Sequence, residues 1–299
     1  MKTVIALVLC TLFALSGCKK DDSNPAAGGQ TSVTQIVFQS SRSGTTCIFV
    51  MNPDGTNQQQ LTTYTGGDLE PTWIHDGSGI VFESTRNGTS EIFKMSPTGT
   101  GITQITHFGS GGWCSSPDAS PDGSKIVCAR YTASTGRINI YVVDIDGSHL
   151  IQLTSSYEGN WTPRWSPDGQ TIVFSRYVNS QFQILTMAAD GTNQQALTQD
   201  TVENYSPCFS KDGSKIVFRS NRDGDNEIFI MDVNGANLRQ LTSNIFSDVD
   251  PFCASLPAGE KILFASDRDG DFEIFVMDMD GANQQQLTSN TSTDGYPSY

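Results

Sequence analysis

Short apolar segments alternate with polar turns along most of the chain. In the clearest example, residues 216–218 and 228–231 are apolar at successive positions, which is typical of strands covered on both faces. Asp223-Gly224 lies between these segments and Asn234-Gly235 follows the second, and both pairs suit tight hairpin turns. With the more polar residues 240–242, the stretch predicts three antiparallel strands.

The same stretch occurs six times. The copies begin at Ile36, Ile80, Ile126, Ile172, Ile216 and Ile262, at separations of 44, 46, 46, 44 and 46 residues. Upstream of most copies lies a further strand and turn, such as PRWSPDG at residues 163–169. Four strands in a repeat of this length are typical of a propeller blade. We therefore predict an all-β fold, a six-bladed β-propeller of four-stranded antiparallel blades over residues 33–299.

The end of the chain predicts how the ring closes. Residues 294–299 match the start of the upstream block, with Tyr299 at the place of Trp73, whereas the first copy lacks that block. We expect this C-terminal strand to be the innermost strand of the first blade. Closure would leave only short, protected sheet edges.

The repeated motifs P-x-W-S-P-D-G, I-V-F-x-S-x-R-D-G and E-I-F-x-M-D-x-D-G resemble the WD40-like repeat of the TolB propeller family. The resemblance covers roughly residues 33–299 and implies the propeller fold. TolB itself has an additional N-terminal α/β domain, for which we expect no room in this chain. Functions specific to TolB are therefore not carried over.

The N-terminus predicts export. Residues 1–17 have a short basic start and an apolar stretch, as in signal peptides, and residues 15–18 (LSGC) resemble the lipobox of bacterial lipoproteins. This resemblance implies that Cys18 is lipidated and becomes the first mature residue; an ordinary secretory signal with an incidental cysteine is the alternative. Residues 18–32 are polar with Gly, Pro and Ser, and we predict a flexible tether.

Residues 19–22 (KKDD) resemble the surface-export signal of some Gram-negative lipoproteins. We expect an outer-membrane lipoprotein, periplasmic or surface-exposed, that contacts the membrane only through the lipid on Cys18. The formal net charge of −14 disfavours nucleic acid and anionic membrane surfaces as partners. We also expect a monomer.

One face of the propeller carries the candidate recognition residues. If the strands of a blade are labelled A to D from the channel outward, the D-to-A loops and B-to-C hairpins share a face, which we name the D-to-A face. Its candidate partner-binding residues are Asp68, Trp113, Asn160, Trp161, Asn204, Tyr205, Asp248, Asp294 and Tyr296. We expect them near the channel mouth. Alternatively, each Asp or Asn caps its loop, and the hairpin residues Arg42, Arg86, Arg222 and Arg268 pair with them as links between blades.

Metal and cysteine chemistry receive little support. Asp267, Asp269, Asp271 and Glu273 are suitable calcium ligands, but they also suit a solvated hairpin, and we expect no other cofactor. After Cys18 an odd number of cysteines remains, without CxxC spacing: Cys47, Cys114, Cys128, Cys208 and Cys253. Cys128 and Cys253 occupy core positions of the repeat. One disulfide is compatible with export but cannot be assigned.

Catalysis is not indicated. The three histidines are scattered, and no nucleophile-elbow or zinc-protease motif occurs. A carboxylate pair across the channel, such as Asp68 with Asp248, is the remaining acid–base option. We expect a non-enzymatic, lipid-anchored envelope scaffold that binds a cell-envelope protein or peptide through the D-to-A face. The alternatives are a glycan-binding or glycan-cleaving propeller and a purely structural envelope component.

Overall fold

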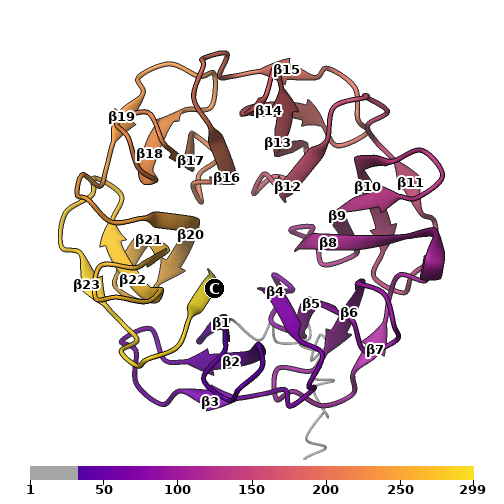
Figure 1. Ribbon diagram of the computed structural model, residues 1–299, viewed down its shortest axis with the longest axis horizontal. Coiled ribbons are helices and arrows are strands. Elements are labelled where there is room, and N and C mark those ends of the chain that lie inside the picture. Colours follow the sequence, from indigo (N-terminus) through magenta and orange to yellow (C-terminus); the bar gives the residue numbers. More distant parts are fainter. Residues whose placement is uncertain (1–32) are drawn as a thin grey trace, which may run out of the picture. The chain divides into compact units, whose positions relative to one another are not determined.

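The computed structural model describes residues 33–299, which form six four-stranded antiparallel sheets arranged in a ring (Figure 1). The predicted all-β, six-bladed propeller is confirmed. Cys18, the predicted signal peptide and the tether lie outside the described residues.

Each blade contributes four strands, which follow one another from the channel outward. Blade 1 comprises β24 (Asp294–Ser298), β1 (Ile36–Ser40), β2 (Cys47–Met51) and β3 (Gln59–Gln60); blade 2 comprises β4 (Asp68–Trp73), β5 (Ile80–Ser84), β6 (Glu91–Met95) and β7 (Thr103–Gln104). Blade 3 comprises β8 (Gly112–Ala119), β9 (Lys125–Thr132), β10 (Arg137–Asp144) and β11 (Ile151–Gln152), and a short 3-10 helix (Gly109–Gly111) precedes it. Blade 4 comprises β12 (Asn160–Trp165), β13 (Thr171–Val178), β14 (Gln181–Ala188) and β15 (Gln195–Ala196). Blade 5 comprises β16 (Asn204–Phe209), β17 (Lys215–Ser220), β18 (Glu227–Asp232) and β19 (Arg239–Gln240); blade 6 comprises β20 (Asp248–Leu256), β21 (Gly259–Ser266), β22 (Glu273–Asp278) and β23 (Gln285–Gln286).

The two ends of the described chain meet in blade 1. The last strand, β24, pairs antiparallel with β1, with Ser298 opposite Val37 and Asp294 opposite Ser40. In Figure 1 the yellow C-terminal strand lies beside the indigo strands of this blade. This arrangement confirms the closure expected from the last residues of the sequence.

The core lies between neighbouring blades, which explains why the middle strands are apolar at successive positions. Val37 and Ile48 of blade 1 pack with Trp73 and Phe82 of blade 2 in one cluster. Because each middle strand is covered on both sides, its alternate residues fill the spaces toward the preceding and the following blade. Burial of each such side chain contributes about 1.5–3 kcal/mol.

Every innermost strand contains a bulge that turns one residue into the channel. The pairing register shifts at this point in all six blades. The residue before each inner proline has a left-handed backbone, with φ between 45° and 52°, in Glu70, Ser116, Thr162, Ser206, Asp250 and Tyr296. We name these six residues the channel ring. Such a conformation is uncommon outside glycine, and a bulge bends its strand locally.

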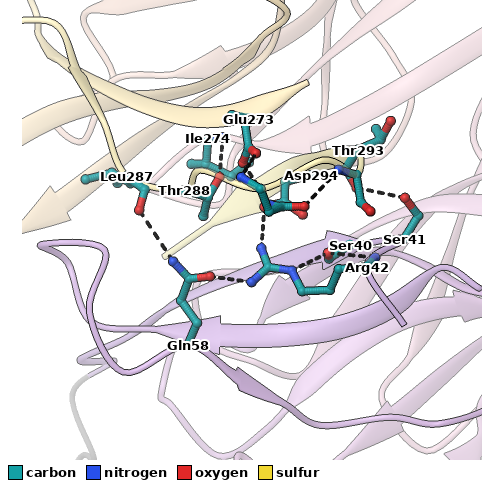
Figure 2. A network of polar contacts seen from close by, with 12 residues as sticks. Ser40, Ser41, Arg42, Gln58, Glu273, Ile274, Leu287, Thr288, Thr293 and Asp294 are labelled. Carbon is teal, nitrogen blue, oxygen red and sulfur yellow. Dashed lines mark hydrogen bonds and ion pairs between the residues drawn. The ribbon is translucent and has the colours of Figure 1, made fainter. Parts of the chain in front are cut away.

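Buried polar side chains connect the blades at their junctions. Between blades 6 and 1, the Asn290 Nδ2 atom donates to Glu273 Oε2 at 3.1 Å and to Asp294 Oδ2 at 3.0 Å. Figure 2 shows the Arg42 guanidinium bonded to Asp294, Ser40 and Gln58 of the same blade. Glu273 and Asp294 have no solvent exposure. A continuous hydrogen-bonded chain therefore runs from β22 across the junction to the first hairpin.

The same arrangement recurs with different charges. Between blades 5 and 6, Asn244 donates to Glu227 and Asp248, and Arg268 binds both Asp248 oxygens at 3.0 Å. Between blades 4 and 5 the two carboxyls are replaced by amides and the bridging asparagine by Asp200. The Asn204 Nδ2 atom donates to Gln183 Oε1 at 3.4 Å and to Asp200 Oδ1 at 2.7 Å. The junction therefore accepts a carboxyl or an amide, provided that its hydrogen bonds are satisfied.

Burial raises the pKa of Glu227 and of Glu273 to about 7, and the adjacent Asp248 and Asp294 carboxylates add to the effect. Hydrogen bonds from Thr242 and Thr288 oppose it. Each glutamate therefore retains its proton to a higher pH in the folded protein than in the unfolded chain, where its pKa is about 4.3. A protonated glutamate can share this proton with its aspartate neighbour.

We predict a pH dependence of stability that originates in these two glutamates. Because the folded chain keeps protons that the unfolded chain releases, the free energy of unfolding falls as pH rises from about 4.5 to 7, by up to about 1.4 kcal/mol per pH unit for each group. The double variant Glu227→Gln/Glu273→Gln should reduce this slope, since Gln183 occupies the equivalent position. The part that remains comes from other acids whose pKa is raised by burial, Glu70, Glu83 and Asp250. Urea unfolding at pH 5 and pH 7.5 measures the slope, with Glu158→Gln, an exposed glutamate, as the control. An unchanged slope in the double variant would contradict the assignment.

We also predict that Asp294→Ala destabilises the propeller by about 3 kcal/mol, because removing one partner of a buried ion pair leaves the Arg42 charge uncompensated. The substitution removes the junction acceptor from the strand that closes the ring. Asp280→Ala, in an exposed turn, should change stability by less than about 1 kcal/mol. Denaturant midpoints of the two variants provide the comparison, and equal midpoints would disprove a special role for Asp294.

Candidate functional site

Blades 3 and 4 have longer hairpins on the D-to-A face than blade 2. Pairing of β5 with β6 ends at Ser84 opposite Glu91. At the equivalent place in blade 3, pairing continues for two further residue pairs, to Thr132 opposite Arg137. Blade 4 likewise continues for two further pairs, to Val178 opposite Gln181. These extensions break the sixfold similarity of the face at two adjacent blades.

Aromatic side chains gather at these extended hairpins. The Trp113 ring stacks on Tyr131 at 5.5 Å between centroids and lies 5.6 Å from Trp161. In a second group, Phe182 contacts Tyr177 at 5.0 Å and Tyr205 at 4.6 Å. Three residues that the sequence singled out, Trp113, Trp161 and Tyr205, are thus brought to this region. Tyr131, Tyr177 and Phe182 were missed, because they belong to strand extensions that the repeat pattern does not contain.

A groove of about 340 Å³ lies between the two extended hairpins. We name it the aromatic groove; it is lined by Gly136, Arg137, Ile138, Tyr157, Gly159, Trp161, Tyr177 and Phe182. Its size falls at the lower end of the range of about 300–1,000 Å³ that is usual for ligand pockets. Tyr157 is 86% exposed and Tyr177 is 43% exposed. Large aromatic surfaces are therefore available to a partner.

The groove contains one cation. The Arg137 guanidinium lies 3.6 Å from the centroid of the Tyr157 ring. Within residues 33–299, no carboxylate forms an ion pair with Arg137, whereas Arg42, Arg86 and Arg268 are paired. An arginine that stacks on an aromatic ring and keeps its donors free can bind a carboxylate of a partner.

The five Asp and Asn candidates lie below the surface. Asp68, Asn160, Asn204, Asp248 and Asp294 have no solvent exposure. Each accepts a hydrogen bond from an arginine of its own blade, namely Arg86, Arg176, Arg222, Arg268 and Arg42. The expected pairing is therefore present, and the arginines mainly connect strands within a blade. Arg222 also pairs with Asp200 in the loop that leaves blade 4, at 3.1 Å. The links between blades come from junction residues such as Glu273. The structure gives these five residues an internal role, and their contact with a partner remains untested.

The channel mouth is formed by other residues than expected. The bulge places the residue before each proline in the channel, so Glu70 and not Asp68 faces inward in blade 2. Of the predicted site residues, Tyr296 belongs to this channel ring. The ring and its neighbours enclose a cavity of about 20 Å³, which is room for about one water molecule. An organic substrate does not fit in it.

The acids of the channel are Glu70 and Asp250. Burial raises the pKa of Asp250 to about 6, against the opposing effect of Arg219. Burial also raises the pKa of Glu70, although its Oε2 accepts the Ser116 N–H at 2.6 Å. This pair replaces Asp68 and Asp248, which the sequence suggested and which each bind an arginine of their own blade. Because the cavity has no room for a substrate, the two acids form part of its wall and have no substrate to act on.

Carboxylates also gather at the hairpin of blade 5. Among residues 33–299, oxygens of Asp223, Asp225 and Glu227 form a group within 4.8 Å of one another. The equivalent residues of blade 6 are Asp269, Asp271 and Glu273, which the sequence proposed as calcium ligands. Carboxylate oxygens suit calcium, and a calcium ion at the blade 6 hairpin stays the alternative to a solvated hairpin. In the described part of the chain, no helix is both long and apolar enough to span a membrane.

Comparisons with known proteins agree with this architecture. The crystal structure of TolB from Acinetobacter baumannii is 22% identical, with a TM-score of 0.77, and the alignment covers 89% of this chain and 66% of that chain. A putative TolB from Agrobacterium tumefaciens is also 22% identical, with a TM-score of 0.72 over 88% of this chain and 92% of that chain. An uncharacterized protein of Agrobacterium fabrum is 41% identical over 61 residues, which is 20% of each chain.

The chain thus spans about two thirds of the Acinetobacter TolB, and the curated match covers one fifth of its relative. At these identities the structural likeness establishes the fold. The family model described as PD40, TolB beta propeller domain, matches residues 22–133, 109–207 and 201–299. These matches extend over most of the sequence, and the chain therefore belongs to the TolB beta propeller domain family.

Proposed function

We propose that this chain is a monomeric, lipid-anchored envelope protein that binds a segment of another envelope protein in the aromatic groove. The observation that carries the proposal is the groove itself, with exposed Tyr157 and Tyr177 beside the free guanidinium of Arg137. The family assignment supports an envelope scaffold in general. The LSGC motif supports attachment through Cys18.

A polypeptide partner suits the chemistry of the groove. Tyrosine, tryptophan and arginine are the residues that most often dominate binding energy at protein interfaces. The groove is formed by two hairpins of a ring whose blades are joined by buried hydrogen bonds. Because these hairpins are already ordered, little conformational entropy is lost when a partner binds. Arg137 is an unpaired cation on a chain of net charge −14. We therefore expect the bound segment to carry a carboxylate next to an aromatic or large apolar side chain.

Glycan binding is the alternative, because exposed tyrosine rings also stack on sugars. A flat platform of the sequence-predicted aromatics would favour it. The Trp113 and Trp161 rings are instead tilted by 37° and pack against each other, which leaves no single flat surface between them. The channel cavity has no room for a sugar ring, so glycan cleavage in the channel is not favoured.

We predict that Arg137→Ala and Tyr177→Ala each weaken partner binding at least tenfold, which corresponds to about 1.4 kcal/mol. A photo-crosslinking residue at position 157 of the full chain in cells should capture one defined polypeptide, and the two substitutions should reduce its yield. A crosslinker at Val233, exposed among the turns of the opposite face, serves as the control. Equal yields from both positions would contradict the site. Crosslinks to glycan but not to protein would establish the alternative.

We predict that Cys18→Ser releases the protein from membrane fractions into the soluble envelope fraction, because no lipid can then be attached. Fractionation of cells that produce either form, with detection of the propeller by antibody, provides the test. Cys47→Ser, which changes a buried thiol of β2, should leave the distribution unchanged. Continued membrane association of the Cys18 variant would disprove the anchor without bearing on the groove.

A further inference from the structure

Four of the five cysteines in residues 33–299 meet in two pairs. The Sγ atoms of Cys114 and Cys128 lie 2.7 Å apart in blade 3. Those of Cys208 in β16 and Cys253 in β20 lie 3.1 Å apart, between blades 5 and 6. Non-bonded carbon atoms rest at roughly 3.5–4.0 Å, and sulfur is the larger atom. Both pairs are therefore closer than two independent side chains in ordinary contact.

We propose that these pairs form two disulfides in the native protein, Cys114–Cys128 within blade 3 and Cys208–Cys253 between blades 5 and 6. The second bond would join the innermost strands of two blades whose cysteines are 45 residues apart in sequence. It would add a covalent connection between blades to the hydrogen-bonded junctions. The bonds require an oxidising compartment, and so the proposal rests on the envelope location proposed above.

The reaction is thiol–disulfide exchange with an external disulfide, such as that of a thiol oxidoreductase or oxidised glutathione. One cysteine thiolate attacks the external disulfide and forms a mixed disulfide, and the first external thiolate leaves. The second cysteine thiolate then attacks the protein sulfur and displaces the other external thiolate. The cysteine pair loses two protons and two electrons, and the external disulfide is reduced to two thiols.

Burial decides when this exchange can occur. Cys114 and Cys128 have no exposure, and Cys208 is 4% exposed. Burial raises the pKa of the Cys114 thiol, while the contact with Cys208, together with burial, raises that of Cys253. Since the thiolate is the reactive form, exchange in the folded ring is slow. The bonds should therefore form during folding, before the blades close over the sulfur atoms, and should then resist reduction.

Pairing also accounts for the odd number of cysteines. The remaining one, Cys47, is buried in β2, and its Sγ atom lies 3.7 Å from the Thr45 hydroxyl. No second Sγ atom among the described residues contacts it. Cys47 is thus an internal reference for a thiol that stays reduced.

The test is a non-reducing peptide map of the full chain, produced with its own N-terminus and exported by a Gram-negative host. The sample is unfolded in the presence of an alkylating reagent before digestion. We expect one peptide linked through Cys114 and Cys128, a second linked through Cys208 and Cys253, and an alkylated Cys47. Reduction should lower the Tm by roughly 5–15 °C, because the cross-links restrict the unfolded chain. In Cys208→Ser/Cys253→Ser, reduction should lower the Tm by less than in the parent chain, because one cross-link is already absent. In Cys47→Ser, which removes no cross-link, reduction should lower the Tm by as much as in the parent chain.

A second arm separates the pairing from the location. The reduced chain is refolded in a mixture of oxidised and reduced glutathione and mapped in the same way. Alkylation of all five cysteines in this refolded sample would overturn the proposal. Disulfides in the refolded sample combined with free thiols in the exported one would support the pairing and overturn the oxidising envelope location. A third possible result, linkage of Cys47 to any partner, would also overturn the assignment.

Discussion

The propeller depends on the satisfaction of polar groups that are buried where one blade meets the next. An isolated blade would expose these groups to water, but the closed ring covers them. At the junction of blades 6 and 1, the chain from Glu273 through Asn290 to Asp294 and Arg42 gives each buried carboxyl at least one partner, while the Asp294 Oδ1 atom accepts no hydrogen bond. A buried charge without a partner is far more unfavourable than a missing apolar contact. Five of the six innermost strands carry such a buried Asp or Asn two residues before the bulge, and blade 3 has Cys114 at this place.

The fold could be predicted from the sequence because the pattern of apolar strands and polar turns repeats at a nearly constant interval. Six apolar copies at a nearly constant spacing define the blades, and Tyr299 at the place of Trp73 defines the closure, which the pairing of β24 with β1 confirms. The identity of the channel residues could not be predicted in this way. Alignment of copies shows which residues are equivalent, but it does not show on which side of the strand they point. A shift of register reverses that side, and the bulge places Glu70 in the channel while Asp68 is buried beside Arg86.

Part of the candidate groove could be predicted, because some of the aromatic residues near it interrupt the repeat. Trp161 and Tyr205 stood out because they vary where the repeat is otherwise regular, and Trp113 stood out because it lies in the longest D-to-A loop. Tyr177 and Phe182 lie opposite each other in an extension of blade 4 that ends in a tight turn at Asn179 and Ser180, both with positive φ. The hairpins of blades 5 and 6 have Arg-Asp-Gly at this place, and those of blades 1 and 2 have Arg-Ser-Gly and Arg-Asn-Gly. The loss of this Arg-x-Gly loop in blade 4 was therefore the available signal. The cysteine pairs had no such signal, because Cys208 and Cys253 become neighbours only when two blades are packed side by side.

The channel ring has a further consequence. Glutamate, serine, threonine, aspartate and tyrosine all adopt the same left-handed backbone there, although only glycine does so without strain. The conformation is therefore imposed by the paired strands on either side of the bulge, and it does not depend on which side chain is present. Mutation can thus exchange the lining of the channel one residue at a time while the blades keep their shape. The centre of this propeller can thus change from an almost filled core to an open pore without a change of architecture.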